Sequence, residues 1–532
     1  MFWPINYVCI LVLSHEMIFT YNKVKIGVNL LAKINSIAVI GLSGEKVEVE
    51  VDLSNGLPAF NIVGLPDKAV EESKERVRSA IKNSGCIFPQ KRITVNLAPA
   101  DLRKEGPSYD LPIAVGILLA SEQIFFDSSK TIFVGELSLN GDIRHTNGIL
   151  PSVMAAKELN FETIVIPGKN TDESSIIDGI AILAADNLKG IVQHYRREAI
   201  IEPVVYKKFV EDENQIYEIN FSQIVGQEHA KRALEIAASG GHNIFMSGPP
   251  GSGKTLLAKA LVSILPPLTY PEALEVTKIY SIVGELHQKG SLIQIRPYRN
   301  PHHTTSDIAL IGGGKWPRPG EISLSHRGVL FLDELPEFPR HVLEVLRQPL
   351  EEGFITISRA NGTLTFPAQF ILVAAQNPCP CGYSTDPEKQ CTCNAAQIVR
   401  YQKKVSGPLL DRMDLHLEVP RVKYEKLADN SLGEDSEQIR SRVIAAREKQ
   451  ESRFKGTSTI SNSEMTLKQL KLYCVLDDEG KSLLLSASKQ LGLSARSYHR
   501  ILKLARTIAD LDDSNEIKIG HLAEALQYRP RN

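Results

Sequence analysis

The chain lacks net charge, sequence repeats and long apolar runs. Its 532 residues carry a formal net charge of −1 at pH 7, so no overall basic field attracts nucleic acid. Any contact with DNA must therefore come from local basic patches or from the inner wall of a ring. The length and the 43% of hydrophobic residues allow about three globular domains with substantial cores.

A membrane-spanning segment is also lacking. The apolar stretch at residues 2–13 is too short to span a bilayer and contains Pro4 and Asn6. It has neither the basic start nor the small-residue cleavage site of a signal peptide. We therefore expect a cytoplasmic protein that does not contact membranes. Residues 1–30 differ from the rest of the chain, and a disordered lead, a docking strand and an upstream start codon read too early all stay open.

Cysteine is scarce, with seven in the chain. The odd number, and the presence of four within one short stretch, argue for a reducing compartment rather than a disulfide framework. These four form a C-x-C…C-x-C pattern and are Cys379, Cys381, Cys391 and Cys393. Four thiolates could close a tetrahedral zinc site, although C-x-x-C is the usual spacing. The alternative is that the reduced cysteines only pack.

The strongest motif is GPPGSGKT, which matches G-x-x-x-x-G-K-[ST] in full. A strand-type segment precedes it and a segment with helical spacing follows, so backbone N–H groups can turn inward around phosphate oxygens. Lys254 places a cation on the β- and γ-phosphates of ATP, and the Thr255 hydroxyl is a ligand of Mg²⁺. The predicted nucleotide-binding loop comprises Gly248, Pro249, Pro250, Gly251, Ser252, Gly253, Lys254 and Thr255.

Two later segments complete a hydrolytic site. The buried-strand pattern that starts at Gly328 ends in Asp333 and Glu334. If this strand lies beside the P-loop strand, Asp333 reaches the Mg²⁺ ion and Glu334 polarises the attacking water. The next core strand, FILVAAQNP, delivers Asn377 to orient that water and to sense the γ-phosphate. We therefore expect the chain to bind and hydrolyse ATP.

Residues 31–200 mix strand and helix patterns and predict one α/β domain. The segments KEGPSYDLPIAVGILLA and VGELSLNGDIRHTNGILPSVMAAKEL resemble the C-terminal proteolytic domain of Lon. The resemblance places Ser108 at the nucleophile and Leu150 at the catalytic lysine. A Ser–Lys dyad needs an amine as its base, and Lys157 lies about two helical turns further on. We interpret this domain as an inactive adaptor or positioning module.

The P-loop domain contains a long insertion. Residues 296–328 carry three consecutive glycines, then Lys315, Trp316 and Arg318, and we expect them to project from the second helix of the domain. The aromatic and basic residues could touch a nucleic-acid backbone. They could equally pack against a neighbouring subunit.

A second insertion and a helical region follow. Residues 340–352 predict one helix. The strands on either side of Asn361-Gly362 then predict a hairpin that carries Arg359. Residues 421–532 predict a polar connector and a C-terminal helical lid.

Five segments together resemble the ComM/YifB family, the magnesium-chelatase-like branch of AAA+ ATPases. They are GPPGSGKT, PRPGEISLSHRGVLFLDELPEF, NPCPCGY, SGPLLDRMDLHLEVP and LSARSYHRILKLARTIADL. The resemblance implies an α/β protein with a Lon-like N-terminal domain, an AAA+ P-loop core and a C-terminal helical lid. The boundaries are 1–30 for an extension outside the family pattern, 31–200 for the Lon-like domain, 201–220 for the linker, 221–420 for the core and 421–532 for the connector and lid.

The resemblance also assigns residues near the nucleotide. Val225 and Gly226 lie where AAA+ ATPases wall the adenine. Arg412 lies where an arginine reaches into the ATP site of the neighbouring subunit. The alternative for Arg412 is an intrachain salt bridge with Asp411 or Asp414.

One lid arginine is assigned in the same way. Arg496 begins the middle helix of the lid and is the candidate for contacting the γ-phosphate. Arg500 lies one turn on, on the same face, and is the second choice.

The function that the resemblance implies is a motor on DNA. It implies a ring, a hexamer, that uses ATP and Mg²⁺, with Zn²⁺ as a candidate third cofactor. The motor would be a helicase that acts on single-stranded or branched DNA and promotes branch migration when naturally competent bacteria recombine incoming strands. A second hypothesis is a chelatase- or chaperone-type ATPase that remodels a protein partner. A third is an ATP-dependent peptidase, against which Leu150 argues.

Overall fold

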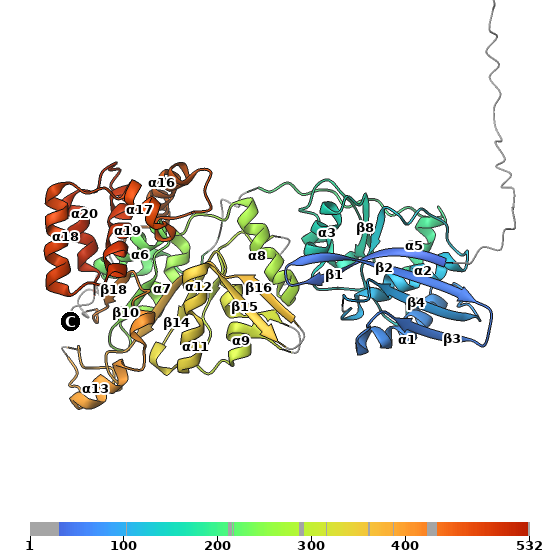
Figure 1. Ribbon diagram of the computed structural model, residues 1–532, viewed down its shortest axis with the longest axis horizontal. Coiled ribbons are helices and arrows are strands. Elements are labelled where there is room, and N and C mark those ends of the chain that lie inside the picture. The colour runs from blue at the N-terminus through green and yellow to red at the C-terminus, as the bar shows by residue number, and fades with distance from the viewer. Residues whose placement is uncertain are drawn as a thin grey trace, which may run out of the picture.

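The computed structural model describes residues 31–102, 104–210, 215, 217–286, 292–314, 317–359, 362–386, 388–422 and 433–529. The expectations for residues 1–30, Lys315, Trp316 and Asn361 lie outside these ranges. The described chain is elongated, with two sheets and their helices placed end to end (Figure 1). None of the described helices is long and apolar enough to cross a membrane.

The first sheet is mixed and has seven strands in the order β3-β4-β2-β1-β5-β8-β9. The strands are β1 (Leu31–Ile40), β2 (Ser43–Ser54), β3 (Ala59–Val63), β4 (Arg92–Ala98), β5 (Thr131–Phe133), β8 (Thr163–Pro167) and β9 (Ala181–Ala185). Along β2, the alternate residues Val47, Val49 and Val51 are fully buried, as a sheet with one covered face requires. The structure therefore has the α/β character expected of this region.

Helices cover this sheet. They are α1 (Lys68–Asn83), α2 (Asp110–Ala120), α3 (Ile149–Glu158), α4 (Thr171–Ser174) and α5 (Leu188–Tyr195), and a small hairpin pairs β6 (Glu136–Leu137) with β7 (Ile143–Arg144). Helix α1 shows why they form. The Asp67 side chain caps it by accepting a hydrogen bond from Val70 N at 2.8 Å, and Val70, Val77 and Ile81 bury one face.

The second sheet is parallel, in the order β11-β14-β17-β10-β18. Its strands are β10 (Ile244–Ser247), β11 (Tyr298–Arg299), β14 (Val329–Leu332), β17 (Ile371–Gln376) and β18 (Leu415–Glu418). The expectation that the Asp333 strand lies beside the P-loop strand is wrong, because β17 lies between β14 and β10. Parallel strands nevertheless end at one edge of the sheet, so all three deliver their residues to the same place.

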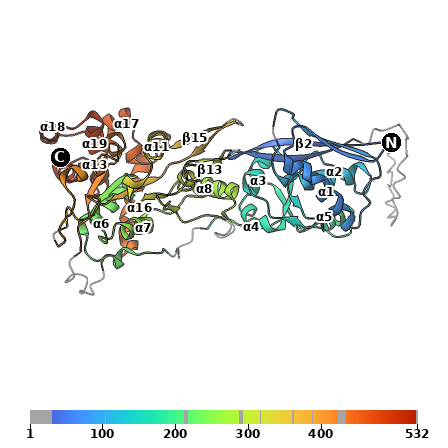
Figure 2. The ribbon, with the colours of Figure 1, turned by 90° about the horizontal axis from the view of Figure 1, so that it is seen from below.

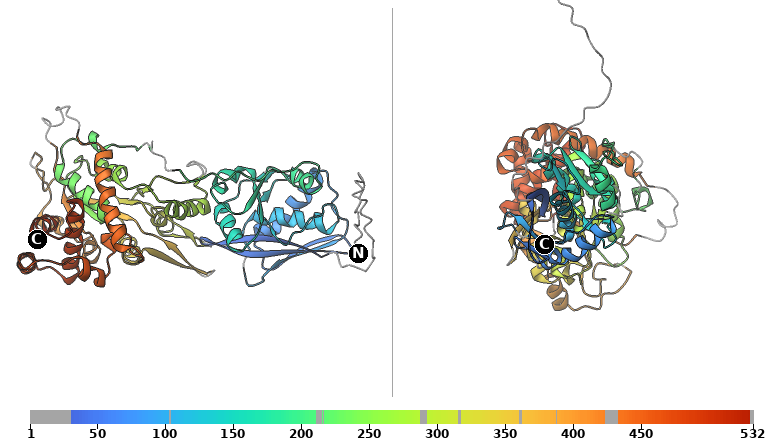
Figure 3. Two further views of the ribbon diagram at one scale, coloured as in Figure 1. Left: turned by 90° about the horizontal axis from the view of Figure 1, so that it is seen from above. Right: turned by 90° about the vertical axis from the view of Figure 1, so that its right-hand side faces the viewer.

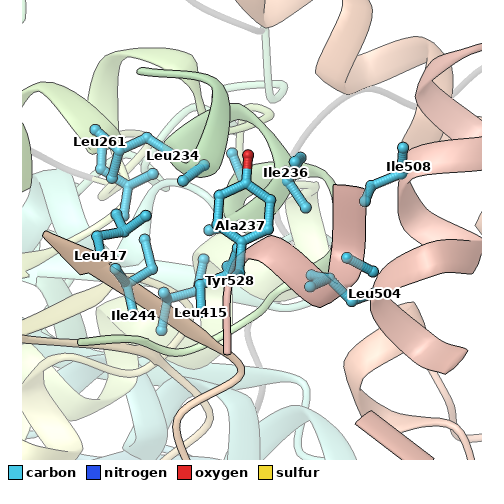
Figure 4. Close-up of a cluster of buried hydrophobic side chains, with 14 of the residues drawn as sticks. Leu234, Ile236, Ala237, Ile244, Leu261, Leu415, Leu417, Leu504, Ile508 and Tyr528 are labelled. Carbon is cyan, nitrogen blue, oxygen red and sulfur yellow. The ribbon is translucent and has the colours of Figure 1, made fainter. Parts of the chain in front are cut away.

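Helices of the P-loop core and the lid enclose this sheet. They are α6 (Glu228–Gly240), α7 (Lys254–Ile264), α8 (Tyr270–Val283), α13 (Ala395–Gln402) and α14 (Gly407–Leu410), then the lid helices α16 (Ser436–Phe454), α17 (Leu467–Tyr473), α18 (Asp478–Leu491), α19 (Ala495–Leu511) and α20 (Ile519–Gln527). Leu504 and Ile508 of α19 pack with Tyr528 against Leu234 and Ile244 of the core (Figure 4). The lid thus closes the apolar core of the sheet.

The insertion region differs from expectation in two places. Residues Tyr298–Arg299 are the edge strand β11 of the core sheet, so only the following residues form α9 (Asp307–Ile311), β12 (Gly312–Gly313), β13 (Arg318–Pro319) and α10 (Glu321–Leu324). Residues 340–352 form two helices, α11 (Arg340–Val345) and α12 (Arg347–Glu352), rather than one. Pro349 explains the break, since it has no N–H to donate to the carbonyl of Val345. The expected hairpin is present as β15 (Phe354–Arg359) and β16 (Gly362–Pro367).

The first sheet is joined to the P-loop core through α8. One buried cluster contains Val153 and Ile164 from the first sheet region together with Val276 and Ile279 from α8. At the same contact, the Ser281 hydroxyl donates to Glu173 Oε2 at 2.7 Å. We call the first sheet and its helices, within residues 31–200, the first module. This module and the P-loop core lie at opposite ends in Figure 2 and Figure 3, with this contact between them. The first module is therefore packed on the P-loop core through a shared apolar cluster.

A second contact lies at the turn between β1 and β2. A Cβ built on Gly41 would lie 3.7 Å from Leu364 of β16, and Leu42 packs against both neighbouring buried clusters. Figure 1 shows the ends of β1 and β2 next to the β15–β16 hairpin. The β1–β2 ribbon of the first module thus contacts the β15–β16 hairpin of the P-loop core.

The apolar contact at α8 predicts the effect of shortening Ile279, which is fully buried. We expect Ile279→Ala to lower the free energy of unfolding by about 2–5 kcal/mol, because the cavity it leaves cannot collapse fully. Urea denaturation measures this, and limited proteolysis reports whether the modules separate. Ile308→Ala, at a side chain that is 53% exposed, is the control. An Ile279→Ala protein as stable as this control would contradict the interface.

Candidate nucleotide-binding site

The P-loop runs from the end of β10 to the start of α7. Gly253 has φ 93°, in the left-handed region that glycine adopts without a Cβ penalty, and it caps the N-terminus of α7. At Gly248 the reason is space, because a Cβ there would lie 2.1 Å from the carbonyl oxygen of Val419. The loop therefore has the strand–turn–helix context in which backbone N–H groups bind phosphate.

Lys254 lies at the centre of the loop and is 8% exposed. Its ammonium donates to Gly248 O at 2.7 Å, to Pro249 O at 3.0 Å and to Asn377 Oδ1 at 3.3 Å. Burial lowers the pKa of Lys254, and the charges of Asp333 and Glu334 oppose this shift. The structure thus brings Lys254 and Asn377 together.

The acidic pair follows β14 and faces the first turn of α7. The Thr255 hydroxyl donates to Asp333 Oδ2 at 3.1 Å, and Asp333 Oδ1 accepts from Glu334 N at 2.9 Å. A hydroxyl and a carboxylate at this separation are the hard oxygen ligands that suit Mg²⁺. Glu334 has φ 52°, and this strained backbone conformation is typical of functional sites.

The turn at Val225 and Gly226 lies next to the P-loop. The following residue, Gln227, donates from Nε2 to Ser252 O at 3.3 Å and to Pro420 O at 2.6 Å. The sequence did not indicate Gln227 as the residue that connects this turn to the loop. No pattern in the sequence pointed to it, because its two acceptors lie far along the chain.

Arg412 pairs within its own chain. Its guanidinium donates to a carboxylate oxygen of Glu351, at the end of α12, and to Pro408 O at 2.6 Å. The alternative predicted from the sequence named Asp411 or Asp414 as its partner, and the observed partner is Glu351. Asp414 instead accepts a hydrogen bond from Asn243 N at 3.1 Å.

Arg496 lies with Arg412, away from the P-loop. Both line a cavity of about 350 Å³, together with Arg500 and Lys503. The described lining of this cavity includes none of the residues of the P-loop. The four basic side chains come from α19 and from the end of the core, and the carboxylates of Glu351 and Asp411 line the same cavity.

The four cysteines of the C-x-C…C-x-C pattern come together in space. Their sulfur atoms all lie within 4.8 Å of one another. The Sγ atoms of Cys379 and Cys391 are 3.8 Å apart, close to the separation of about 3.8 Å in a tetrahedral zinc–thiolate site. Hydrogen bonds from the backbone N–H groups of Tyr383 and Thr392 lower the pKa of Cys381 to about 5, which favours the thiolate. The cluster could therefore hold a metal ion.

The described residues around Ser108 supply no amine at the expected base position. Leu150 is fully buried in the apolar cluster at α3. The buried Lys104 donates to the carbonyl of Pro99, and burial lowers its pKa. Lys157 is exposed in the last turn of α3. Leu150 is thus a core residue.

Three family profiles match the chain. The magnesium chelatase subunit ChlI profile matches residues 220–427, the profile for subunit ChlI of Mg-chelatase matches 49–170, and the ChlI C-terminal profile matches 433–529. The chain is 46% identical to competence protein ComM of Haemophilus influenzae over 503 residues, which are 94% of this chain and 97% of the relative. The chain belongs to the ComM/YifB family.

Other ComM/YifB and chelatase proteins extend the comparison. An uncharacterized YifB protein of Escherichia coli is 43% identical over 94% of this chain and 97% of its own length. The magnesium-chelatase subunit ChlI of Cyanophora paradoxa is 26% identical over 42% of this chain and 64% of its own length. The profile matches identify this chain, as a member of the ComM/YifB family, as one of the magnesium-chelatase-like AAA+ ATPases.

The cysteine cluster predicts tight binding of Zn²⁺ by the purified, reduced protein. We expect about one zinc ion per chain by elemental analysis, and loss of this zinc in Cys391→Ser, because three thiolates and a hydroxyl bind zinc more weakly than four thiolates. A chelator should make the loop between Cys381 and Cys391 more sensitive to protease. Cys86→Ala, at a buried cysteine outside the cluster, is the control and should keep its zinc. If the reduced wild-type protein contains no bound metal, the prediction fails and the four cysteines only pack against one another.

Proposed function

We propose that this chain hydrolyses ATP at the P-loop site and uses the energy to move DNA. The observation that carries the first part is the meeting of Thr255 and Asp333 at 3.1 Å beside Lys254 and Asn377. These residues come from three parallel strands, and few functions other than nucleotide hydrolysis need this set at one edge of a sheet.

Each side chain has a separate role in this proposal. Lys254 contacts the phosphates, and Thr255 and Asp333 hold Mg²⁺, which neutralises charge on the phosphates when it is bound. Glu334 accepts a hydrogen bond from the attacking water, and Asn377 orients that water. Val225 and Gly226 wall the adenine.

The position of the arginines supports a ring. Arg412 and Arg496 line one cavity, and its described lining includes no P-loop residue, which is compatible with a role at a nucleotide on another chain. An arginine supplied in trans is worth about 10³–10⁵ in rate. We therefore propose a closed ring of identical subunits, a hexamer, in which each interface completes one ATP site.

The two insertions support DNA as the substrate. Hairpin β15–β16 and the β12–β13 insertion lie side by side, with the guanidinium of Arg359 3.0 Å from a Cβ built on Gly313. Arg318 and Arg359 are both exposed on these elements. Facing the centre of a ring, such basic tips would bind the phosphate backbone without reading its sequence.

The printed name of the Haemophilus relative, competence protein ComM, adds a biological setting. We propose that this chain acts in the cytoplasm as a helicase for branch migration, on single-stranded or branched DNA, during recombination in natural transformation. The alternative is a chelatase- or chaperone-type motor that pulls on a protein. The packing of the first module on α8 would then make that module the place where the protein partner binds.

The first test is the ATP hydrolysis rate with and without forked or four-way DNA. We expect hydrolysis that DNA stimulates, and at least about a hundredfold loss in Glu334→Gln, because an amide is a poor general base. Migration of a labelled four-way junction should require ATP. A real rate that no DNA changes would favour the protein-remodelling alternative.

Mixing two inactive variants tests the shared interface. We expect Lys254→Ala and Arg412→Ala each to lose about 10³-fold or more in kcat, whereas a mixture recovers activity at interfaces that combine an intact Lys254 with an intact Arg412. Lys404→Ala, at an exposed lysine paired with Glu337, is the control and should stay active. If the mixture is as inactive as either variant alone, Arg412 does not act between subunits.

A further inference from the structure

The segment that carries the four clustered cysteines lies against the nucleotide-binding loop. We call it the cysteine loop, and it comprises the described residues 379–386 and 388–393. Its first turn is closed by Gly382, whose N–H donates to the carbonyl of Cys379 at 2.9 Å and whose φ is 87°. A Cβ built on Gly382 would lie 2.6 Å from Cδ of Pro250 and 3.9 Å from Cγ of Asn377. This turn therefore touches both the P-loop and the amide that we propose orients the attacking water.

The cysteine loop also reaches the P-loop by a second route. The Arg421 guanidinium lies 3.2 Å from Oε2 of Glu388 and 3.8 Å from Oδ2 of Asp386. Arg421 follows Pro420, whose carbonyl accepts a hydrogen bond from Gln227 Nε2 at 2.6 Å. The same amide donates to the backbone of the P-loop at 3.3 Å. The cysteine loop is thus connected to the P-loop at two separate places.

Sulfur atoms hold the cysteine loop together. Its described residues form neither a helix nor a strand, and only Cys379 and Gly382 among them are buried. The Sγ atom of Cys381 lies 3.4 Å from that of Cys379 and 3.5 Å from that of Cys391. The N–H of Cys381 donates to Cys393 Sγ, and the N–H of Cys393 donates to Cys391 Sγ, both at 3.4 Å. Such donors stabilise thiolates, but four thiolates this close repel one another unless a cation lies between them. We therefore expect the shape of the loop to depend on a bound metal ion.

We infer that the cysteine loop, when its thiolates bind Zn²⁺, fixes the P-loop in its binding conformation and so raises the affinity of the site for nucleotide. The inference rests on the proposed function, because it takes the P-loop as the place where nucleotide binds. With Zn²⁺ bound, Gly382 keeps Pro250 in place, so less conformational entropy is lost when the phosphates bind. Without Zn²⁺ the nucleotide itself has to order both loops. Because such coupling is reciprocal, bound nucleotide strengthens the binding of Zn²⁺ by the same factor.

The test measures both affinities on the full chain, kept reduced, with and without Zn²⁺. A chelator removes the zinc and is itself removed by gel filtration, and the binding of fluorescent ADP with Mg²⁺ is followed by anisotropy. We expect the zinc-free protein to bind ADP about 5- to 20-fold more weakly, as is typical of coupling between two sites. Adding back about one Zn²⁺ per chain should restore the affinity. In competition with a chromogenic zinc chelator, saturating ADP should raise the affinity for Zn²⁺ by the same factor.

Three variants separate this effect from a general loss of folding. Cys391→Ser should bind ADP as weakly as the zinc-free wild type and should not respond to added Zn²⁺. Gly382→Ala keeps all four cysteines but places a methyl group against Pro250, so its zinc-loaded form should also bind ADP weakly. Lys389→Ala is the control, because this exposed lysine of the same loop contacts the Tyr383 ring, and it should behave as the wild type.

The outcomes distinguish the inference from the proposed function. Equal ADP affinities of the zinc-loaded and zinc-free wild type, or a reduced wild type that binds no Zn²⁺, would overturn the inference and leave the proposed function intact. A zinc-loaded Gly382→Ala protein with wild-type affinity for ADP would overturn the inference as well. A wild type that binds no ADP in either form would overturn the proposed function itself.

Discussion

The common edge of the parallel sheet is the constraint on which the nucleotide site depends. Strands β10, β14 and β17 are parallel and buried on both faces, with Met246, Leu330 and Val373 fully covered. Because the three strands run in the same direction, the P-loop, the acidic pair and Asn377 all emerge at one edge. The hydrogen bonds at Lys254 and Thr255 follow from this arrangement of the backbone.

Basic side chains gather at a second place in the chain. Acidic and neutral polar groups lie at the sheet edge with Lys254, whereas Arg412, Arg496, Arg500 and Lys503 line another cavity together with Glu351 and Asp411. Within one chain, Glu351 neutralises part of this second group. A γ-phosphate on a neighbouring chain would compete with Glu351 for Arg412. In the single chain the ion pair satisfies part of a buried guanidinium, whose Nε has no hydrogen-bond partner among the described residues.

The parts of this site that depend on local pattern were predictable from the sequence. GPPGSGKT, Asp333-Glu334 and Asn377 each sit at the end of an apolar strand, and the structure brings them together. Contacts between residues distant in the chain were not predictable in this way. Nothing near Arg412 in the sequence indicates Glu351, and a two-residue strand such as β11 is too short to show a period. The order β14-β17-β10 was missed because sequence shows which segments are strands but not which strands are neighbours.

The β1–β2 ribbon spans the first module, and its turn rests on the β15–β16 hairpin. Ten paired residues of β1 extend over about 33 Å. Such a ribbon would act as a lever that pivots on the apolar contact at α8 and whose short arm ends at Gly41. A small tilt of the hairpin would therefore be amplified at the far end of the first sheet. If the chain hydrolyses ATP as we propose, the first module would then serve as an indicator of the state of the nucleotide site.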